Sequence, residues 1–337
     1  MSSAATNSVS SLVQSLGDIP PEAVVFGYSE AMQALRERLA KIAAANVPVL
    51  IHGESGTGKD IIARLVHALS PWKSGPFVKV NCPAIPGTLL ESELFGYERG
   101  AFTGAYGAKP GRVEMAHRGS LFLDEISELD MSLQSKLLQL LQDGQFCRIG
   151  AQADKKVEVR IVCATNRRLE DEIENGTFRQ DLFYRINVVN LYMPPLRERR
   201  GDISTLVEYF LEHYNRKYNC KARPVSPELM DVLQKYHWPG NIRELENFLE
   251  RAVILTRGSV LYVPLAELET QAAEEEEQLE NTNPTLHAAE REHILRVLRE
   301  TKGQIGGSDG AAERLGLKRT TLNSKLKKLG IERSDYM

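Results

Sequence analysis

Two short stretches of the chain carry residue types that could act on a phosphate group. The first, GESGTGKD (53–60), lies between the apolar run VPVLI (47–51) and the helical pattern IIARLVHAL (61–69). Its glycines allow backbone N–H groups to wrap around an anion at a helix N-terminus, and Lys59 supplies a positive charge to the β- and γ-phosphates. We assign nucleotide binding to Gly53, Glu54, Ser55, Gly56, Thr57, Gly58, Lys59 and Asp60.

Asp60 departs from the general phosphate-loop pattern, which has Ser or Thr at this place to bind Mg²⁺. One interpretation is a loop that no longer holds a nucleotide. The glycine spacing and Lys59 favour a loop that still binds one, so the pattern predicts a nucleotide site.

The stretch SLFLDE (120–125) supplies the second half of the chemistry. It is an apolar strand pattern that ends in two acids, Asp124 and Glu125. Asp124 is placed to hold Mg²⁺, and Glu125 to orient and deprotonate an attacking water. Acids at a strand end can also be solvated ends with no chemical role. Because these acids follow a phosphate loop by about 65 residues, the pattern favours nucleotide hydrolysis.

The elements that must position these residues follow from the hydrophobic pattern. Between Val24 and Pro195, short β-branched runs alternate with helical patterns, which predicts a parallel sheet covered by helices on both faces. The patterns SPELMDVLQKY (226–236) and NIRELENFLERAVIL (241–255) then predict a small helical subdomain. The predicted strands are VPVLI (47–51), FVKVN (77–81), SLFLD (120–124), VRIVCAT (159–165) and INVVNL (186–191).

An acidic stretch separates the last part of the chain from the rest. Residues 266–284 hold seven glutamates and no basic residue, which we interpret as a solvated linker. A helix over 286–300 and two short helices over 310–315 and 319–329 then give a helix-turn-helix layout. Spacing along the last helix predicts that its leucines are buried: Leu322, Leu326 and Leu329.

The terminal module is the basic end of the chain. Eight Lys or Arg residues oppose three acids between Lys302 and Arg333. A dimerisation bundle is one interpretation, but exposed basic and hydroxyl side chains on the last helix favour DNA binding. We assign DNA contacts to Lys318, Arg319, Thr320, Thr321, Asn323, Ser324, Lys325, Lys327 and Lys328.

Composition sets the broad class of the protein. The 337 residues are 42% hydrophobic and 26% charged with a formal net charge of −3, as in ordinary globular domains. Four scattered cysteines indicate neither a zinc site nor a disulfide framework, which fits a reducing cytoplasm. Neither a signal peptide nor an apolar run of about 18 residues is present, so we expect no membrane partner. The predicted domains are a flexible segment 1–21, an α/β domain 22–195, a helical subdomain 196–265, a linker 266–284 and a helix-turn-helix domain 285–337.

Six motifs together resemble the central AAA+ domain of bacterial sigma-54-dependent transcription activators, the enhancer-binding proteins. They are GESGTGKD, ELFGYERGAFTGA, LFLDEI, FRQDLFYRINV, PPLRERRGDI and HWPGNIRELEN, and the resemblance extends over residues 25–265. The terminal module resembles the Fis-type helix-turn-helix that these activators carry. The resemblance implies an AAA+ P-loop NTPase fold with a helical lid, and ATP and Mg²⁺ as ligands. An acidic residue at the place of Asp60 is common in that family.

The resemblance also implies roles for single residues. Asn81 would be the switch that holds Glu125 away from water, and Asn166 the sensor near the γ-phosphate. Both asparagines could instead satisfy backbone groups at strand ends. Arg243 would be the second sensor on the lid, and the ATP site would include Val25 and Phe26.

Two arginines would act between subunits. The resemblance implies that Arg179 and Arg185 are arginine fingers that reach a neighbour's nucleotide, so active sites would form only in an oligomer. Both lie among acids such as Asp181 and Glu174, where a surface ion pair is the usual alternative. The family assembles from dimers into a ring, which we expect to be a hexamer.

The stretch GAFTGA is nearly diagnostic of the family on its own. In the family it tips a loop that rises from the ring and presses on the sigma factor, with Phe giving an apolar and Thr a polar contact. A tight turn with a buried Phe is the alternative. Residues 145–159 would form a companion surface loop. The residues assigned to sigma-factor contact are Gly100, Ala101, Phe102, Thr103, Gly104 and Ala105.

The expected function is an ATPase that binds upstream enhancer DNA and remodels the closed complex of sigma-54 RNA polymerase into an open one. A DNA-binding regulator that keeps the AAA+ fold only as a scaffold is a second hypothesis. Another AAA+ remodeller, such as a helicase loader, is a third. We expect no fused N-terminal sensory domain, which fits either control by a regulatory protein in trans or a chain cut from a longer one.

Overall fold

The computed structural model describes residues 19–220, 225–256, 261, 286–301, 303–307, 310–317, 319–329 and 331. The chain divides into two units between Val263 and Pro264. Residues 1–18 of the predicted flexible segment, and the whole predicted linker 266–284, lie outside the described residues.

The first unit is built around a five-stranded parallel sheet with the strand order β2-β5-β8-β1-β9. Parallel pairing brings the carboxyl ends of the strands to one edge of the sheet. The strand that precedes the phosphate loop, β1, lies between β8 and β9. The predicted parallel sheet is therefore confirmed, with strands β1 (Val49–His52), β2 (Phe77–Asn81), β5 (Gly119–Asp124), β8 (Val159–Thr165) and β9 (Val189–Tyr192).

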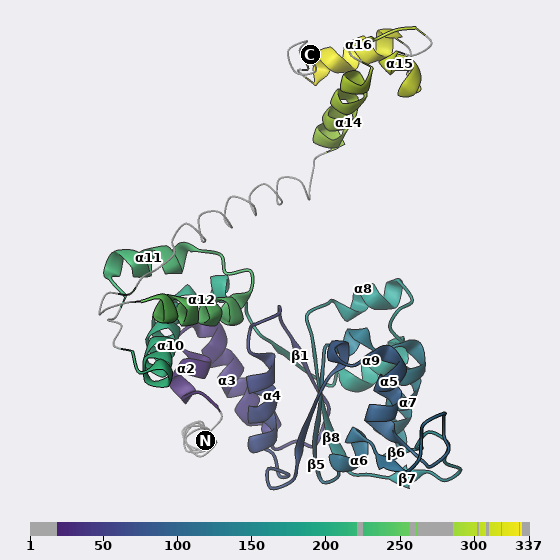
Figure 1. Cartoon of the computed structure of the whole chain (residues 1–337), viewed down its shortest axis with the longest axis vertical. Helices are drawn as coiled ribbons and strands as arrows, with labels where there is room; N and C mark the ends of the chain where they lie inside the picture. Colours follow the sequence, from purple (N-terminus) through teal and green to yellow (C-terminus); the bar gives the residue numbers. More distant parts are fainter. Residues whose placement is uncertain are drawn as a thin grey trace. The chain divides into compact units, whose positions relative to one another are not determined.

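Side chains alternate between the two faces of this sheet and fill two separate cores. Leu50 and Leu123 contribute to one core, whereas Ile51 and Phe122 contribute to the other. Figure 1 shows the sheet between two sets of helices. Covering on both faces explains why the inner strands β1, β5 and β8 are buried along most of their length. One set is α2 (Glu22–Phe26), α3 (Glu30–Ala43) and α4 (Lys59–Ala68), and the other is α5 (Gly87–Phe95), α6 (Arg112–Met115), α7 (Met131–Asp143), α8 (Leu169–Glu174) and α9 (Gln180–Ile186).

The strand predicted over 186–191 was wrong at its start. Ile186 is the last residue of α9, and β9 begins only at Val189. Leu182 and Ile186 lie one helical turn apart on α9, which packs on α7, and both are fully buried. Ile186 is β-branched, and such residues prefer strands to helices. Its packing against α7 therefore outweighs its local preference.

Two short hairpins project from the α/β part. One pairs β3 (Gly96–Tyr97) with β4 (Lys109–Pro110) and encloses GAFTGA. The other pairs β6 (Gln145–Phe146) with β7 (Lys155–Lys156) and encloses the predicted companion loop. Tyr97 of β3 and Ile149, in the loop between β6 and β7, form a bridge, so the two hairpins touch.

Three helices form the predicted helical subdomain: α10 (Ile203–Tyr218), α11 (Pro227–Lys235) and α12 (Asn241–Leu255). The turn between α11 and α12 contains two residues with positive φ, Trp238 at 52° and Asn241 at 55°. Trp238 is fully buried, and its indole N–H donates to the carbonyl of Leu233 at 2.7 Å. The buried indole therefore fixes the sharp turn from which α12 begins.

The second unit contains α14 (Leu286–Glu300), α15 (Ala311–Arg314) and α16 (Arg319–Lys328). Its core includes Ile294 and Leu298 from α14, together with Leu322 and Leu326 from α16. Leu329 is half-buried against the same core. The helix-turn-helix layout and the burial of Leu322 and Leu326 are therefore confirmed.

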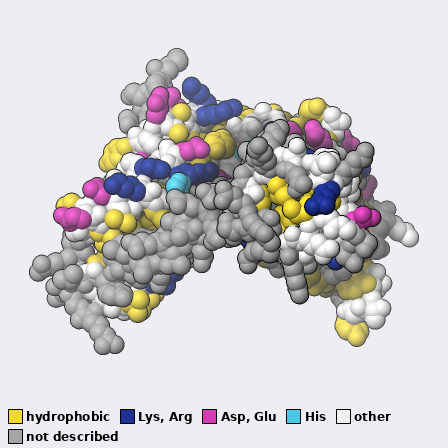
Figure 2. Space-filling model, turned by 90° about the horizontal axis from the view of Figure 1, so that it is seen from above, with side chains coloured by type: hydrophobic (Ala, Val, Ile, Leu, Met, Phe, Trp, Pro, Cys, Tyr) yellow, Lys and Arg dark blue, Asp and Glu magenta, His cyan; other side chains and the backbone are white. Residues whose placement is uncertain are grey.

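Neither the charged side chains on the surface nor the cysteines mark out a ligand site among the described residues. Lys and Arg side chains lie among Asp and Glu side chains on the face shown in Figure 2. All four cysteines are free, and no three His, Cys, Asp or Glu side chains of the described residues come together as a metal site. Among the helices described, none has the length and apolar character needed to cross a membrane. A ligand site is therefore best sought at the carboxyl edge of the sheet.

Arg160 ties two helices to the centre of the sheet. Arg160 belongs to β8, and its side chain is 1% exposed. The guanidinium donates to the carbonyl of Ile42 in the last turn of α3 (3.1 Å) and to that of Val66 in the last turn of α4 (3.4 Å). A cation there lies beside the last carbonyls of both helices, where the helix dipole favours positive charge, although the carbonyl of Ile42 also accepts from the backbone N–H of Ala45 at 3.1 Å. Burial lowers the pKa of Arg160 to about 10, so it stays charged at neutral pH.

We expect Arg160→Met to lower the free energy of unfolding by about 2–4 kcal/mol, because the carbonyls of Ile42 and Val66 at two helix ends lose a charged donor. Urea unfolding followed by tryptophan fluorescence measures this, since both tryptophans, Trp72 and Trp238, belong to the first unit. Arg168→Met is the control, because that side chain is 79% exposed. The control should change the free energy by less than about 0.5 kcal/mol. Equal losses in the two variants would contradict the anchoring role.

Candidate functional site

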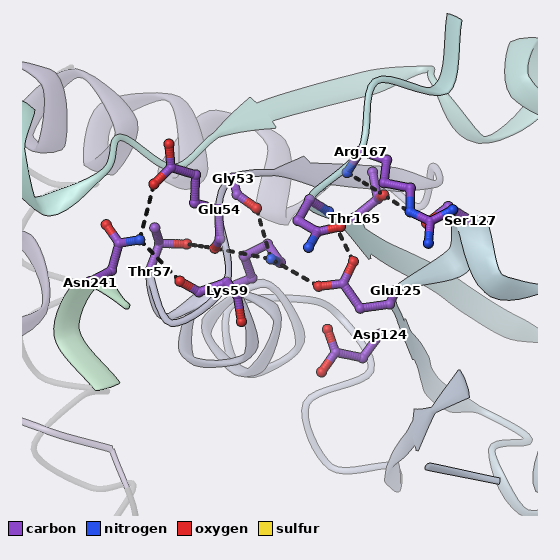
Figure 3. Close-up of polar contacts among 12 residues, drawn as sticks. Gly53, Glu54, Thr57, Lys59, Asp124, Glu125, Ser127, Thr165, Arg167 and Asn241 are labelled. Carbon is purple, nitrogen blue, oxygen red and sulfur yellow. Dashed lines mark hydrogen bonds and ion pairs between the residues drawn. The ribbon is translucent and has the colours of Figure 1, made fainter. Parts of the chain in front are cut away.

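The phosphate loop joins the end of β1 to the start of α4. Gly56 and Gly58 have φ of 77° and 93°, a region that favours glycine. Lys59, the first residue of α4, is 5% exposed. Its ammonium donates to the carbonyls of Gly53 (2.8 Å) and Glu54 (3.1 Å) and lies 3.2 Å from Oε1 of Glu125 (Figure 3). The structure therefore brings together the lysine and the acid that the sequence separates.

The two predicted acids lie at the end of β5. Asp124 is its last residue, and Glu125 follows with φ of 55°. Oε2 of Glu125 accepts a hydrogen bond from the backbone N–H of Asn166, at the end of the neighbouring strand β8 (2.9 Å). Asn81 is in register with Asp124 and lines the same cleft, but the hydrogen bonds of the described residues join Glu125 to Asn166 and not to Asn81. The switch role of Asn81 stays a prediction.

A lysine that the sequence analysis missed lies between two carboxylates. Nζ of Lys79 is 3.5 Å from Oδ2 of Asp60 and 3.5 Å from Oδ2 of Asp124. Burial raises the pKa of Asp124, and the charge of Lys79 opposes that shift. Carboxylate oxygens beside a phosphate loop are the ligands that Mg²⁺ prefers, so Asp60 and Asp124 fit the ion. Strand alternation in FVKVN could have shown that Lys79 and Asn81 share a face.

The helical subdomain closes the site from the other side. Arg197 donates to both carboxylate oxygens of Glu54, at 2.8 and 2.6 Å, and this pair holds the pKa of Glu54 below its usual value. Asn241 donates to Oε2 of Glu54 at 3.1 Å (Figure 3). Arg243, the predicted second sensor, donates to Oγ of Ser55 at 3.2 Å. Two of these lid contacts, from Arg197 and Asn241, were not predicted.

A cleft of about 860 Å³ lies between the phosphate loop and the lid. Val25 lines it, whereas Phe26 is 1% exposed and packs in the core instead. Tyr209 and His213 of α10 form part of the wall contributed by the lid. The predicted nucleotide residues that line the cleft are Ser55, Gly56, Thr57, Gly58, Lys59, Asp60, Asn81, Asp124, Glu125 and Arg243.

The two predicted arginine fingers do not line this cleft. Arg179, just before α9, pairs with Asp181 (3.0 and 2.7 Å) and donates to Oγ of Ser135 (3.1 Å). Arg185 donates to the carbonyl of Leu141 at 3.2 and 2.9 Å. Within one subunit, both guanidinium groups therefore contact the surface around α7 and α9.

GAFTGA forms an exposed loop with two left-handed glycines. Gly100 and Gly104 have φ of 83° and 100°, and a Cβ on either would meet no atom within 4 Å. Phe102 is 44% exposed and makes an edge contact with the ring of Tyr97. The alternative of a tight turn with a buried Phe is therefore wrong. Ala105, in contrast, is buried.

The last helix, α16, exposes part of the predicted DNA surface. Arg319, Thr320, Thr321 and Ser324 are exposed. Lys325 is half-buried and pairs with Glu290 of α14, so its charge is partly neutralised. Lys318 and the side chains of Asn323, Lys327 and Lys328 lie outside the described residues.

Three family models match the chain in succession. The model of the sigma-54 interaction domain matches residues 25–192, and that of an AAA+ ATPase lid domain matches residues 197–284. The model of the bacterial regulatory protein Fis family matches residues 285–329. Their order is the order of the parts that the structure shows.

Curated relatives are similar over the same parts. The regulatory protein AtoC of Escherichia coli is 44% identical over 319 residues, which cover 91% of this chain and 68% of AtoC. The chain belongs to the sigma-54-dependent activator family. The formate hydrogenlyase transcriptional activator FhlA of Escherichia coli is 44% identical over 329 residues, which cover 96% of this chain and 47% of FhlA. The chain spans about half the length of the first curated relatives it matches.

Solved structures agree with this assignment. NtrX from Brucella abortus in complex with ATP has a TM-score of 0.67 and 38% identity, over 91% of this chain and 69% of NtrX. NtrX in complex with ADP gives the same TM-score and identity over 90% of this chain. The chain therefore carries an AAA+ ATPase domain with its lid and a Fis-type helix-turn-helix domain.

We expect Gly56→Ala to weaken ADP binding at least about tenfold, because two costs coincide at this position. Its φ of 77° disfavours any side chain, and a Cβ would overlap the carbonyl oxygen of Gly240, at the start of the lid helix α12. Calorimetric titration with ADP measures the affinity. Gly201→Ala is the control, since a Cβ there meets no atom within 4 Å and φ is ordinary. Unchanged affinity in Gly56→Ala would show that the lid does not approach the loop this closely.

Proposed function

We propose that this activator hydrolyses ATP in a ring of its own subunits. The cycle converts closed complexes of sigma-54 RNA polymerase into open ones at promoters that carry an upstream binding site. The observation that carries the proposal is the contact between Lys59 and Glu125, which line one cleft, in a chain that also exposes the GAFTGA loop. A scaffold that only binds DNA has no need of either feature.

The hydrolysis step rests on the groups around Glu125. The ammonium of Lys59 now contacts two loop carbonyls and Glu125. A polyphosphate in the cleft attracts that ammonium, and Glu125 is then released to orient a water and accept its proton. Asp60 and Asp124 would hold Mg²⁺, which when bound neutralises charge on the phosphates. The N–H of Asn166 keeps the carboxylate of Glu125 at the correct edge of the sheet.

The ring is supported by the position of the two fingers. Arg179 and Arg185 lie outside the cleft of their own subunit, on a surface formed by α7 and α9. A guanidinium supplied by a neighbour stabilises charge in phosphoryl transfer, which an arginine turned away from its own site could do only in trans. The surface ion pair of Arg179 with Asp181 contributes little to stability. Arg179 can therefore leave Asp181 and pair with a phosphate at little cost in free energy.

Exposed surfaces are assigned to the two remaining partners, the sigma factor and double-stranded DNA. Phe102 and Thr103 at the loop tip would contact the sigma factor, since an exposed aromatic beside a hydroxyl suits a protein surface. Arg319, Thr320, Thr321 and Ser324 would face double-stranded DNA, with the arginine on phosphate. Control by a separate regulatory protein stays a prediction.

We expect Glu125→Gln to lower ATP turnover by about 10²–10⁴-fold while ATP still binds, because an amide cannot accept the proton of the attacking water. A coupled phosphate-release assay measures turnover, and calorimetry with ATP measures binding. Glu128→Gln is the matched control, since Glu128, three residues after Glu125, pairs with Arg167 and does not line the cleft. Full hydrolysis by Glu125→Gln would overturn the assignment of the base.

We expect Thr103→Ala to keep ATP turnover but to lose open-complex formation by sigma-54 RNA polymerase, because the loop tip lies apart from the cleft residues. Both quantities are recorded in the same reaction, on a promoter with the activator's own binding site. Thr88→Ala, an exposed threonine on α5, should retain both. If the unchanged protein hydrolyses ATP and opens no promoter, the scaffold or another client becomes the better hypothesis.

A further inference from the structure

Three consecutive carbonyl groups of the phosphate loop are held by donors from residues 199–243, on the lid side of the cleft. The carbonyl of Ser55 accepts from Nδ2 of Asn241 at 3.0 Å, and that of Thr57 accepts from the guanidinium of Arg199 at 3.1 Å. Between them, the carbonyl of Gly56 accepts from the backbone N–H of Ile242 at 3.0 Å. The lid therefore contacts the backbone of the loop and not only its side chains.

The orientation of these carbonyls fixes the opposite ends of the same peptide groups. A trans peptide is planar, with its C=O and N–H pointing in opposite directions. The N–H groups of Gly56, Thr57 and Gly58 are thus turned away from the lid donors, in a loop that lines the cleft. In the described part of the chain, none of these three N–H groups donates a hydrogen bond outside a helix. They are the donors that a phosphate would need.

We propose that Asn241 and Arg199 are positioning residues that orient the phosphate-binding N–H groups of the loop through its carbonyls. The inference rests on the proposed nucleotide binding and adds how the lid takes part in it. Asn241 does not line the cleft, and Arg199, which does, acts in this proposal through the carbonyl of Thr57. The lid sets the geometry of the phosphate cradle, and moving the lid releases it.

Both donors are themselves held in place. Asn241 is fully buried, and its Oδ1 accepts from the N–H of Leu196 at 2.8 Å. Its φ of 55° is tolerated by asparagine, whose side chain here bridges Leu196, Glu54 and the loop. Arg199 is 2% exposed, and burial lowers its pKa to about 10, so it remains a cation at neutral pH. Its Nε has no partner among the described residues, which leaves the carbonyl of Thr57 as its anchor.

The variant that tests the inference is Asn241→Asp. Aspartate tolerates the same backbone conformation and can still accept from Leu196, but it cannot donate to the carbonyl of Ser55. We expect the affinity for ADP to fall about tenfold, and that for adenosine to change less than about twofold, because only the phosphates use the cradle. Calorimetry on the full chain gives the ADP value, and ligand-observed NMR gives the adenosine value.

Two further variants separate orientation of the loop from general docking of the lid. Arg199→Met removes the donor to Thr57 and should weaken ADP alone, as Asn241→Asp does. Arg197→Met removes the ion pair with the Glu54 side chain but no carbonyl contact, so both affinities should stay within about twofold. If Asn241→Asp fails to fold by circular dichroism, Asn241→Gly, which also accepts this φ, replaces it.

The outcomes distinguish this inference from the proposed function. Equal losses of ADP and adenosine in Asn241→Asp and Arg199→Met, or an equal loss of ADP in Arg197→Met, would overturn the positioning role while nucleotide binding stands. Absence of ADP binding to the unchanged protein would overturn both. A loss confined to ADP in Asn241→Asp and Arg199→Met supports the inference.

Discussion

The polarity of the peptide group is the constraint on which this nucleotide site depends. A loop that presents N–H groups to phosphates must turn the carbonyls of those peptides away, and each buried carbonyl needs a donor. The carbonyls of Ser55, Gly56 and Thr57 find donors on the lid side of the cleft and not on the sheet. The phosphate loop is therefore completed by residues that come more than a hundred positions later in the chain.

The order of the strands also sets the distance between the two acids and the phosphate loop. Because β8 lies between β5 and β1, the acids after β5 are two strand spacings, about 10 Å, from the strand that leads to the loop. That interval leaves room for a phosphate and an ion. The side chain of Lys59 spans this interval, and its ammonium lies 3.2 Å from Oε1 of Glu125. The backbone N–H of Asn166, just after β8, donates to the other carboxylate oxygen of Glu125. The sheet thus fixes both the acids and the loop although β1 and β5 do not pair directly.

The sequence predicts those parts of the site that are local and fails for those that are not. Glycine spacing and strand alternation place Lys59, Asp124 and Glu125, because both signals span only a few residues. Arg197 and Asn241 lie 143 and 187 residues from their shared partner Glu54, and a lone Arg or Asn has no local pattern that indicates such a partner. The misplaced start of β9 has the same cause, since burial against α7 decides the conformation of Ile186.

The glycines of the chain show where the fold explains a residue and where it does not. At Gly56 a side chain would overlap the backbone of the lid, so packing would require glycine even without the positive φ. At Gly100 and Gly104 space is open, and only the positive φ requires glycine. The bend they permit leaves Phe102 44% exposed, with an edge contact to the ring of Tyr97. Packing among the described residues does not require this bend, and the proposed contact with a sigma factor would give it a use.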